Sequence, residues 1–230
     1  MGEDTFDAKN NKSPLLLRIL GGGTPYFVKT PRWLKMVYPK RTWHLPANDK
    51  TIYLTFDDGP HPVATPFVLD TLKSYGAHAT FFCIGKNVAA HPEIYDRILQ
   101  EGHRLGNHTF QHLNGWKTDA DTYLADVKKA EALIDSRLFR PPYGRMSGEQ
   151  VRRMKGYHII MWDVLSGDFD TQLAKEKCLD HVLTHTKAGS IVVFHDSEKA
   201  FAKLSYCLPE LMKTFVERGF RFDVLPDIRG

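Results

Sequence analysis

The sequence has few cysteines, no long hydrophobic run and little net charge. Its 230 residues include only Cys83, Cys178 and Cys207, and an odd number at such wide spacing does not form a disulfide framework. No stretch reaches the roughly 18 apolar residues that a membrane-spanning helix needs. The formal net charge is +4 and no long block of lysine and arginine is present, so we expect no nucleic-acid partner. No protein partner is implied either.

The N-terminal segment also lacks a recognisable export signal. Acidic residues precede the short apolar stretch 15–20, where a signal peptide would carry basic residues. We expect residues 1–25 to be a flexible leader or an extension added by cloning, 26–50 to be a lead-in that packs on a barrel, and 51–230 to be the catalytic domain. The cellular location stays open: the sequence by itself favours the cytoplasm, although a cell-wall substrate would require export.

Short apolar segments alternate with amphipathic segments from residue 51 onward. This alternation predicts parallel strands that are joined by right-handed helical crossovers. Predicted strands span 51–57, 79–84, 103–107, 137–140, 158–163, 190–195 and 221–225. Predicted helices span 63–75, 88–101, 117–136, 147–155, 173–187 and 201–218, and in the second of these Ile94, Ile98 and Leu99 are expected on one side. The sequence therefore predicts an α/β fold, a distorted (β/α) barrel of about seven parallel strands in a single domain.

Polar residues follow several of these strands, at positions where an α/β barrel carries its active site. They are Asp57 and Asp58, His108, Arg140, Asp163 and Asp168, and His195. We expect them to converge on one rim of the barrel.

A metal site is predicted from two of these segments. The adjacent carboxylates of Asp57 and Asp58 repel each other unless a cation or a shared proton lies between them. His108 and His112 are four residues apart, a spacing that would put both imidazoles on one face of a helical turn. One carboxylate with two imidazoles makes a three-ligand site with open positions, and the second carboxylate is left as a base.

The other candidates each have a structural alternative. Arg140 opens a rigid turn that contains two prolines, and its guanidinium could hold Asp57 in one orientation. Trp162 and Phe169 could stack on a sugar face, but either could equally pack in the core. His195 ends a buried strand and is interpreted as a general acid rather than a core histidine.

These motifs, in this order, resemble the polysaccharide deacetylase family, also called carbohydrate esterase family 4 or the NodB-homology domain. The resemblance covers roughly residues 50–226 and rests on Thr55–Pro60, His108–His112, Arg140–Gly144 and Val193–His195. It implies a distorted (β/α) barrel with fewer than eight strands.

The resemblance also implies roles for individual residues. Asp57 would be the catalytic base and Arg140 would orient it. Asp58, His108 and His112 would bind a divalent metal, most simply zinc, with cobalt, nickel or manganese as alternatives.

The turn and the last strand would complete the site. Pro141 and Tyr143 would face the substrate, with the Tyr143 backbone N–H helping to bind the oxyanion. His195 would be the acid, with Asp168 as its partner. One motif departs from the family pattern, because Phe169 stands where the family commonly has tryptophan, which leaves the apolar wall for the substrate in question.

The function hypothesis is metal-dependent removal of N-acetyl groups from an N-acetylated polysaccharide or oligosaccharide, either peptidoglycan or a chitin-like N-acetylglucosamine polymer, with release of acetate. A related hydrolase acting on a non-sugar amide and a catalytically silent carbohydrate-binding protein are the alternatives. A nucleotide-sugar glycosyltransferase would leave the three histidines unused.

Overall fold

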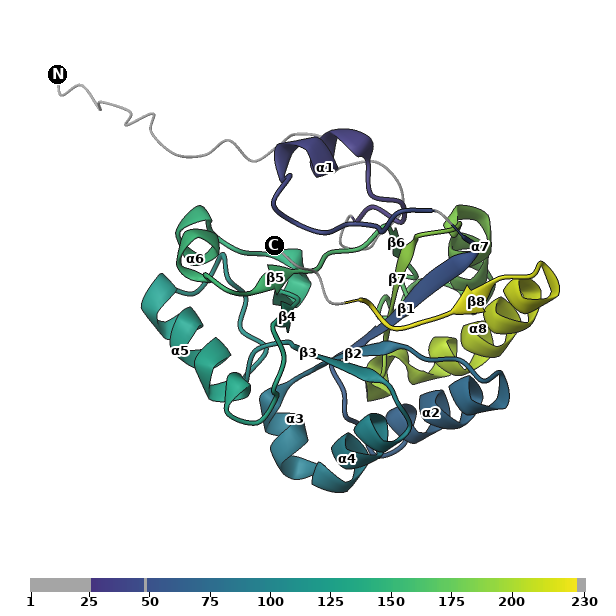
Figure 1. The fold of residues 1–230 in the computed structure, drawn as a ribbon, viewed down its shortest axis with the longest axis horizontal. Coiled ribbons are helices and arrows are strands. Elements are labelled where there is room, and N and C mark those ends of the chain that lie inside the picture. Colours follow the sequence, from purple (N-terminus) through teal and green to yellow (C-terminus); the bar gives the residue numbers. More distant parts are fainter. Residues whose placement is uncertain (1–25, 48, 227–230) are drawn as a thin grey trace, which may run out of the picture.

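The computed structural model describes residues 26–47 and 49–226, which form a curled parallel sheet surrounded by helices (Figure 1). The predicted leader, residues 1–25, lies outside the described residues. The strands are β1 (Thr51–Asp57), β2 (Thr80–Cys83), β3 (Arg104–Asn107), β4 (Leu138–Phe139), β5 (His158–Ile159), β6 (Val164–Leu165), β7 (Ile191–His195) and β8 (Arg221–Phe222). Seven of them follow the order β5-β4-β3-β2-β1-β7-β6, every pair is parallel, and β8 pairs with β1. This confirms the predicted distorted barrel.

The helices follow the predicted pattern, with two differences. They are α1 (Arg32–Val37), α2 (Ala64–Ser74), α3 (Gly85–Ala90), α4 (Pro92–Gln100), α5 (Ala120–Glu131), α6 (Gly148–Arg153), α7 (Lys175–His185) and α8 (Glu198–Glu217), with a 3₁₀ turn at Pro142–Gly144. Helix α1 was not predicted. The predicted helix 88–101 is two helices, because His91 precedes Pro92 and adopts an extended φ of −135° rather than a helical one. Within α4, Ile94 and Ile98 are buried but Leu99 is 48% exposed, so its predicted place on their side was wrong.

The predicted strand 158–163 is also two separate strands. Strand β5 pairs with β4 and β6 pairs with β7, and residues 160–163 connect them as a loop rather than a helix. Asp163 therefore precedes β6 instead of following a strand. Its expected position on the catalytic rim was wrong, because its carboxylate lies beside Ser190 at the amino end of β7.

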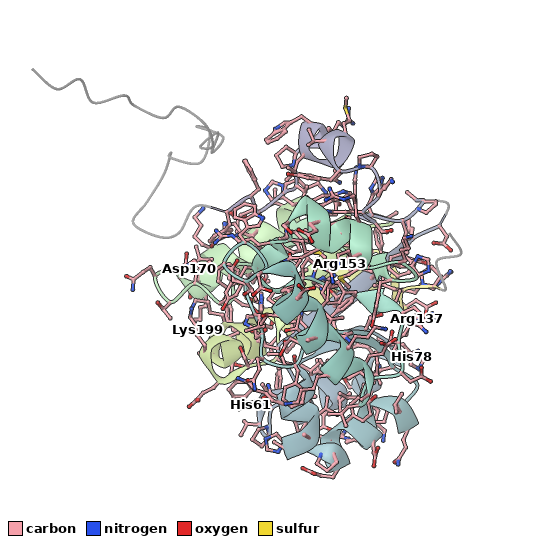
Figure 2. All side chains as sticks on the ribbon, turned by 90° about the vertical axis from the view of Figure 1, so that its left-hand side faces the viewer. His61, His78, Arg137, Arg153, Asp170 and Lys199 are labelled. Atoms are coloured by element: carbon pink, nitrogen blue, oxygen red, sulfur yellow. The ribbon has the colours of Figure 1, made fainter. Side chains whose placement is uncertain are left out.

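The N-terminal lead-in fills the opening between β5 and β6. Lys29 forms an antiparallel bridge with Val164, and Thr42 forms a parallel bridge with Ile160. Between these two contacts the chain makes α1, which stands at one edge of the molecule with side chains extending outward (Figure 2). Among the described residues, no helix is both long and apolar enough to cross a membrane.

Aromatic stacking holds the centre of the sheet. Phe56 in β1 stacks on Phe81 of β2 and on Phe194 of β7, with ring centroids 5.1 and 6.2 Å apart, and all three are buried. Each fully buried ring of this size contributes about 2 to 3 kcal/mol by leaving water. The packing fixes the register of the three strands, so that Asp57 at the end of β1 is the direct partner of His195 in β7.

Candidate active site

Asp57 is held by a fully buried arginine. Its Oδ1 accepts a hydrogen bond of 2.7 Å from Nη1 of Arg140, which also donates to Thr55 Oγ1 at 2.8 Å. The remaining guanidinium nitrogens donate to the backbone carbonyls of Ile160 and Met161. Because every edge of the guanidinium is engaged, the arginine cannot rotate, and it fixes the orientation of the Asp57 carboxylate.

Three predicted ligands lie together beside this carboxylate. One oxygen of Asp58 lies 3.2 Å from Nε2 of His112 and 3.6 Å from Nε2 of His108, and the three candidate ligand atoms are all within 4.8 Å of one another. Asp58 Oδ1 is buried and accepts no hydrogen bond. A buried carboxylate oxygen without a donor, facing two imidazole nitrogens, fits a divalent cation.

The protonation states suit metal binding. Nδ1 of His108 lies 2.7 Å from the carbonyl of Arg140, which assigns the proton to Nδ1 and leaves the Nε2 lone pair facing Asp58. Burial lowers the pKa of His108 to about 4, so the imidazole is neutral. Burial opposes ionisation of Asp58, but the contact with the His112 imidazole and the charge of His195 hold the pKa of its carboxyl well below the usual range. The site thus offers an anionic carboxylate at Asp58 and a neutral imidazole at His108, with the ring of His112 beside them.

The backbone that carries these ligands is a strained loop, not a helix. The prediction that His108 and His112 share a helical turn was wrong in its geometry, although the two rings do meet, with centroids 5.0 Å apart. Four non-glycine residues of the described chain have a positive φ in the left-handed region, between 59° and 80°. They are Asp58, Thr109, His112 and Tyr143. Such strain persists where the surroundings over-determine it, typically at functional sites.

His195 is oriented by Asp168. Its Nδ1 lies 2.8 Å from one oxygen of Asp168, and its backbone N–H donates to the other oxygen at 2.7 Å. Burial would lower the pKa of His195, but Asp168 and, further away, Asp58 and Asp57 raise it to about 9. The imidazole is therefore protonated at neutral pH, with Nδ1 engaged and Nε2 left for another partner.

The residues that were predicted to contact the substrate differ in their exposure to solvent. Tyr143 is 59% exposed and its ring lies against His112, with centroids 4.7 Å apart. Pro141 is buried, and its carbonyl accepts the Gly144 N–H, so it shapes the turn instead of facing solvent. Trp162 is half-buried beneath the same turn, where a side chain at Gly144 would meet its ring at 2.6 Å.

Phe169 lies beside His195, the predicted acid. Its ring meets His195 edge to face at 5.1 Å and packs on Tyr26 at the same distance. The phenyl group therefore packs between the imidazole of His195 and the ring of Tyr26.

The sequence reasoning missed the residue that supports the Asp57–Asp58 turn. Asp196 is fully buried, and it accepts hydrogen bonds from the backbone of Gly59 at 3.0 Å and from Thr65 Oγ1 at 2.5 Å. Any side chain at position 59 would collide with this carboxylate, since a Cβ there would lie 2.1 Å from Oδ2. Burial, with a further contribution from Asp58, raises the pKa of Asp196 to about 8. Its position directly after His195 is the feature of the sequence from which Asp196 could have been predicted.

Two more supports hold the histidine loop. Asp126 accepts the backbone N–H groups of Phe110 and Gln111, both at 2.9 Å, and Asn107 accepts that of Thr109 at 2.8 Å. No sequence signal marked Asp126, which reads as an ordinary polar position of α5. These bonds satisfy the backbone of a loop that has no regular structure.

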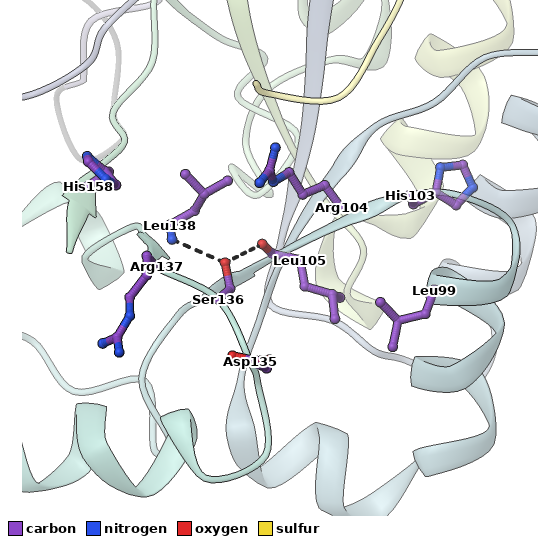
Figure 3. A pocket seen from close by; sticks show the side chains of 9 residues that line it. All are labelled: Leu99, His103, Arg104, Leu105, Asp135, Ser136, Arg137, Leu138 and His158. Atoms are coloured by element: carbon purple, nitrogen blue, oxygen red, sulfur yellow. Dashed lines mark hydrogen bonds between the residues drawn. The ribbon is translucent and has the colours of Figure 1, made fainter. Parts of the chain in front are cut away.

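A hollow at the amino ends of the strands contains none of the residues predicted for the active site. It is lined by residues at the starts of β3, β4 and β5, among them Arg104, Arg137 and His158 (Figure 3). Arg104 donates to the Leu225 carbonyl and Arg137 pairs with Glu131. The two arginines of this hollow are therefore already engaged by other groups.

Comparisons with known proteins agree with this geometry. A family model described as polysaccharide deacetylase matches residues 44–160. A peptidoglycan-N-acetylglucosamine deacetylase of Bacillus cereus is 35% identical over 199 residues, which cover 81% of this chain and 92% of the relative. A chitooligosaccharide deacetylase of Azorhizobium caulinodans is 31% identical over 203 residues, covering 78% and 94%.

A solved structure extends the agreement to the fold. The crystal structure of a peptidoglycan N-acetylglucosamine deacetylase in complex with 4-naphthalen-1-yl-N-oxidanyl-benzamide superposes with a TM-score of 0.78 at 30% identity, covering 86% of this chain and 95% of that one. The predicted family, distorted barrel and deacetylase class of enzyme are confirmed. The chain belongs to the polysaccharide deacetylase family.

Proposed function

We propose that the chain hydrolyses the N-acetyl groups of a polymer or oligomer of N-acetylglucosamine, such as peptidoglycan or chitin fragments, and releases acetate. The observation that carries this proposal is the pairing of Asp57 with His195 across β1 and β7, beside the Asp58–His108–His112 cluster. Adjacent strands lie about 4.8 Å apart, so a base and an acid reach the same small volume.

Asp57 acts as the base. Its carboxylate, oriented by Arg140, accepts a proton from the water that attacks the acetamide carbon. A divalent cation bound by Asp58, His108 and His112 would polarise the acetamide carbonyl and lower the pKa of that water. We propose zinc, because two imidazoles and one carboxylate are a common zinc ligand set, with cobalt, nickel or manganese as substitutes.

His195 acts as the acid. An amide nitrogen leaves only after it gains a proton, and the imidazolium of His195 holds one while Asp168 keeps its Nδ1 engaged. As the C–N bond breaks, Nε2 gives its proton to the sugar nitrogen, so that acetate and a free amine result. A positioned acid or base contributes about 10²- to 10⁴-fold to the rate.

Exposed aromatic rings support a carbohydrate as the substrate. Tyr143 flanks the cluster, and Trp116 is 64% exposed on a segment that packs beside Arg145, two residues after the tyrosine. The sequence reasoning did not single out Trp116. Such rings present flat apolar faces together with a polar tip, which suits the mixed surface of a sugar. The relatives named above act on peptidoglycan and on chitooligosaccharides, which gives the same substrate class.

The test is acetate release from N-acetylglucosamine oligomers and from peptidoglycan by chelator-stripped protein, with and without added Zn²⁺ or Co²⁺. We expect metal-dependent release that falls about 10³-fold in Asp57→Asn, within the range for loss of a general base. Release that needs no metal, or that survives Asp57→Asn, would reject the mechanism. Turnover of a simple non-sugar acetamide in preference to any sugar would instead favour the alternative hydrolase, and metal binding without turnover would favour the binding protein.

A further inference from the structure

Helix α1 packs one apolar side chain, Leu34, against the core and presents the others to solvent. Trp33, Met36 and Val37 recur at the spacing of one helical face, and they are 46%, 77% and 59% exposed. Tyr38, directly after the helix, is 40% exposed. No residue of α1 is buried. We call these four side chains the α1 patch. A short surface helix normally buries its apolar side chains, whereas α1 leaves three of its four largest ones exposed.

The inward side of α1 is held by an ion pair. Lys35 donates to the buried carboxylate of Asp163 at 2.6 Å, and Lys29, just before the helix, pairs with the same carboxylate. Asp163 also accepts from Ser190. These polar contacts fix the rotation of the helix, so the outward direction of the α1 patch is built into the fold.

The surroundings of the α1 patch are basic. Residues 26–47 contain five lysines and arginines (Lys29, Arg32, Lys35, Lys40 and Arg41) and no aspartate or glutamate. Arg32 and Lys40 are exposed and make no ion pair with any described residue. Arg41 lies over the Tyr38 ring, 4.3 Å from its centroid. Apolar and aromatic tips surrounded by unpaired cations are the pattern of an interfacial membrane-binding element.

Two further observations distinguish a bilayer from another protein. Helix α1, which carries the patch, stands at one edge of the molecule (Figure 2). Four partly exposed side chains also fall well short of the roughly 800 Å² per partner that a stable protein interface buries. A lipid surface needs no shape complementarity and adds an attraction for each cation near anionic headgroups.

We propose that the α1 patch, with Arg32 and Lys40, binds the surface of an anionic phospholipid bilayer. The helix is tied to Asp163 and Ser190 at the amino end of β7, whereas His195 lies at the carboxyl end of that strand, about 16 Å away at 3.3 Å per residue. Bilayer contact through α1 therefore leaves the catalytic rim open to a polymer. This proposal is independent of the substrate proposed above.

The test is co-sedimentation of the full chain with phosphatidylcholine vesicles made with and without phosphatidylglycerol. We expect binding that requires phosphatidylglycerol and weakens with added salt. The double variant Trp33→Ser/Met36→Ser should lower the partition coefficient at least tenfold. Arg32→Glu/Lys40→Glu should also lower it at least tenfold, since each cation near an anionic surface is worth about fivefold.

Matched controls come from exposed residues elsewhere in the molecule. Leu133→Ser/Val216→Ser removes side chains that are 41% and 42% exposed, and Lys73→Glu/Lys213→Glu makes the same charge change on α2 and α8. Both controls should bind as the parent does. Equal weakening in the controls would overturn the proposal, as would the absence of vesicle binding by the full chain.

Two other outcomes would also overturn it. A dimer in solution that dissociates in Trp33→Ser/Met36→Ser would make a second copy the occupant of the α1 patch. Trp33 fluorescence that is already shielded from acrylamide without lipid, measured against Trp33→Phe, would show that another segment of the chain covers the patch. Circular dichroism and acetate release from a soluble oligomer check that each variant is folded.

Discussion

Two buried aspartates flank strand β6 and are used in different ways. Asp163 precedes the strand and is surrounded by Lys29, Lys35 and Ser190, whereas Asp168 follows it and receives both hydrogen bonds from His195. Each is at most 1% exposed. The partners differ in chemistry, because a lysine keeps its proton across the physiological range and an imidazole can release it. At the amino ends of the strands, the buried carboxylate of Asp163 thus makes permanent ion pairs. At the carboxyl ends, the buried carboxylate of Asp168 supports proton transfer by His195.

Replacing the carboxylate of Asp168, at the carboxyl ends of the strands, should have the largest effect on activity. In Asp168→Asn, the amide no longer stabilises the imidazolium of His195, and we expect kcat for acetate release to fall about 10²- to 10³-fold. The matched variant Asp163→Asn should keep kcat within about twofold of the parent, since it lies at the amino ends of the strands. Equal losses of kcat in the two variants would show that the two aspartates do not differ as described.

Replacing the carboxylate of Asp163, at the amino ends of the strands, should have the largest effect on stability. Asp163→Asn leaves two partly buried lysines without an anion, and we expect the free energy of unfolding to fall by about 3 kcal/mol in denaturant titrations at pH 7. Burial raises the pKa of Asp163, but its contacts with Lys29, Lys35 and Ser190 lower it below its ordinary value.

The sign of that shift predicts a pH dependence. A carboxyl whose pKa is lowered on folding stabilises the protein above its unfolded pKa of about 4, and the stabilisation is lost as the pH falls through the folded pKa. The difference in stability between the parent and Asp163→Asn should therefore shrink in acid. A difference that stays constant down to pH 3 would contradict the ion-pair description.

A smaller effect is expected from the support beneath the metal-binding turn. Thr65→Val removes the hydroxyl that donates to Asp196, and we expect about a tenfold loss of kcat/KM with a weaker affinity for the metal, because the turn that carries Asp58 loses one tie. Thr65→Ser keeps the hydroxyl and should restore both values. Calorimetric titration with Zn²⁺ measures the affinity. Unchanged metal binding in Thr65→Val would show that the hydrogen bond between Thr65 and Asp196 has only a structural role.

The smallest effect is expected at the wall beside the acid. Phe169→Trp enlarges the ring that contacts His195 and gives the tryptophan common in the family. We expect KM for longer oligomers to change about threefold, with little change in kcat, because the ring touches the acid without exchanging a proton. A large fall in kcat would mean that the phenyl group controls the position of His195.

The sequence predicted the site better than the backbone that carries it. Asp57 and His195 end their strands and Asp58 follows directly, and the parallel order of those strands brings them together as expected. The His108–His112 loop was taken for a helical turn because spacing alone cannot show that Thr109 adopts a left-handed φ of 65°. That conformation is held by a local bond from the Thr109 N–H to Asn107 and by tertiary bonds from the next two backbone N–H groups to Asp126.

Other misses have similar causes. Asp163 was placed on the rim because a continuous apolar stretch hides the break between β5 and β6. Helix α1 was not predicted because most of its apolar side chains are exposed, and a periodicity argument assumes that they are buried. Asp196 was overlooked because its role lies in bonds to Gly59 and Thr65, more than 130 positions away in the sequence.

The most direct test of the account is the pH profile of kcat/KM for the parent enzyme and Asp168→Asn in the same metal. The account requires a protonated His195, so activity should fall as the pH rises through the pKa of that imidazole, which Asp168 raises. Removing the carboxylate should move this alkaline limb to lower pH and leave the acid limb in place. Superimposable alkaline limbs in the two proteins would contradict the assignment of His195 as the acid.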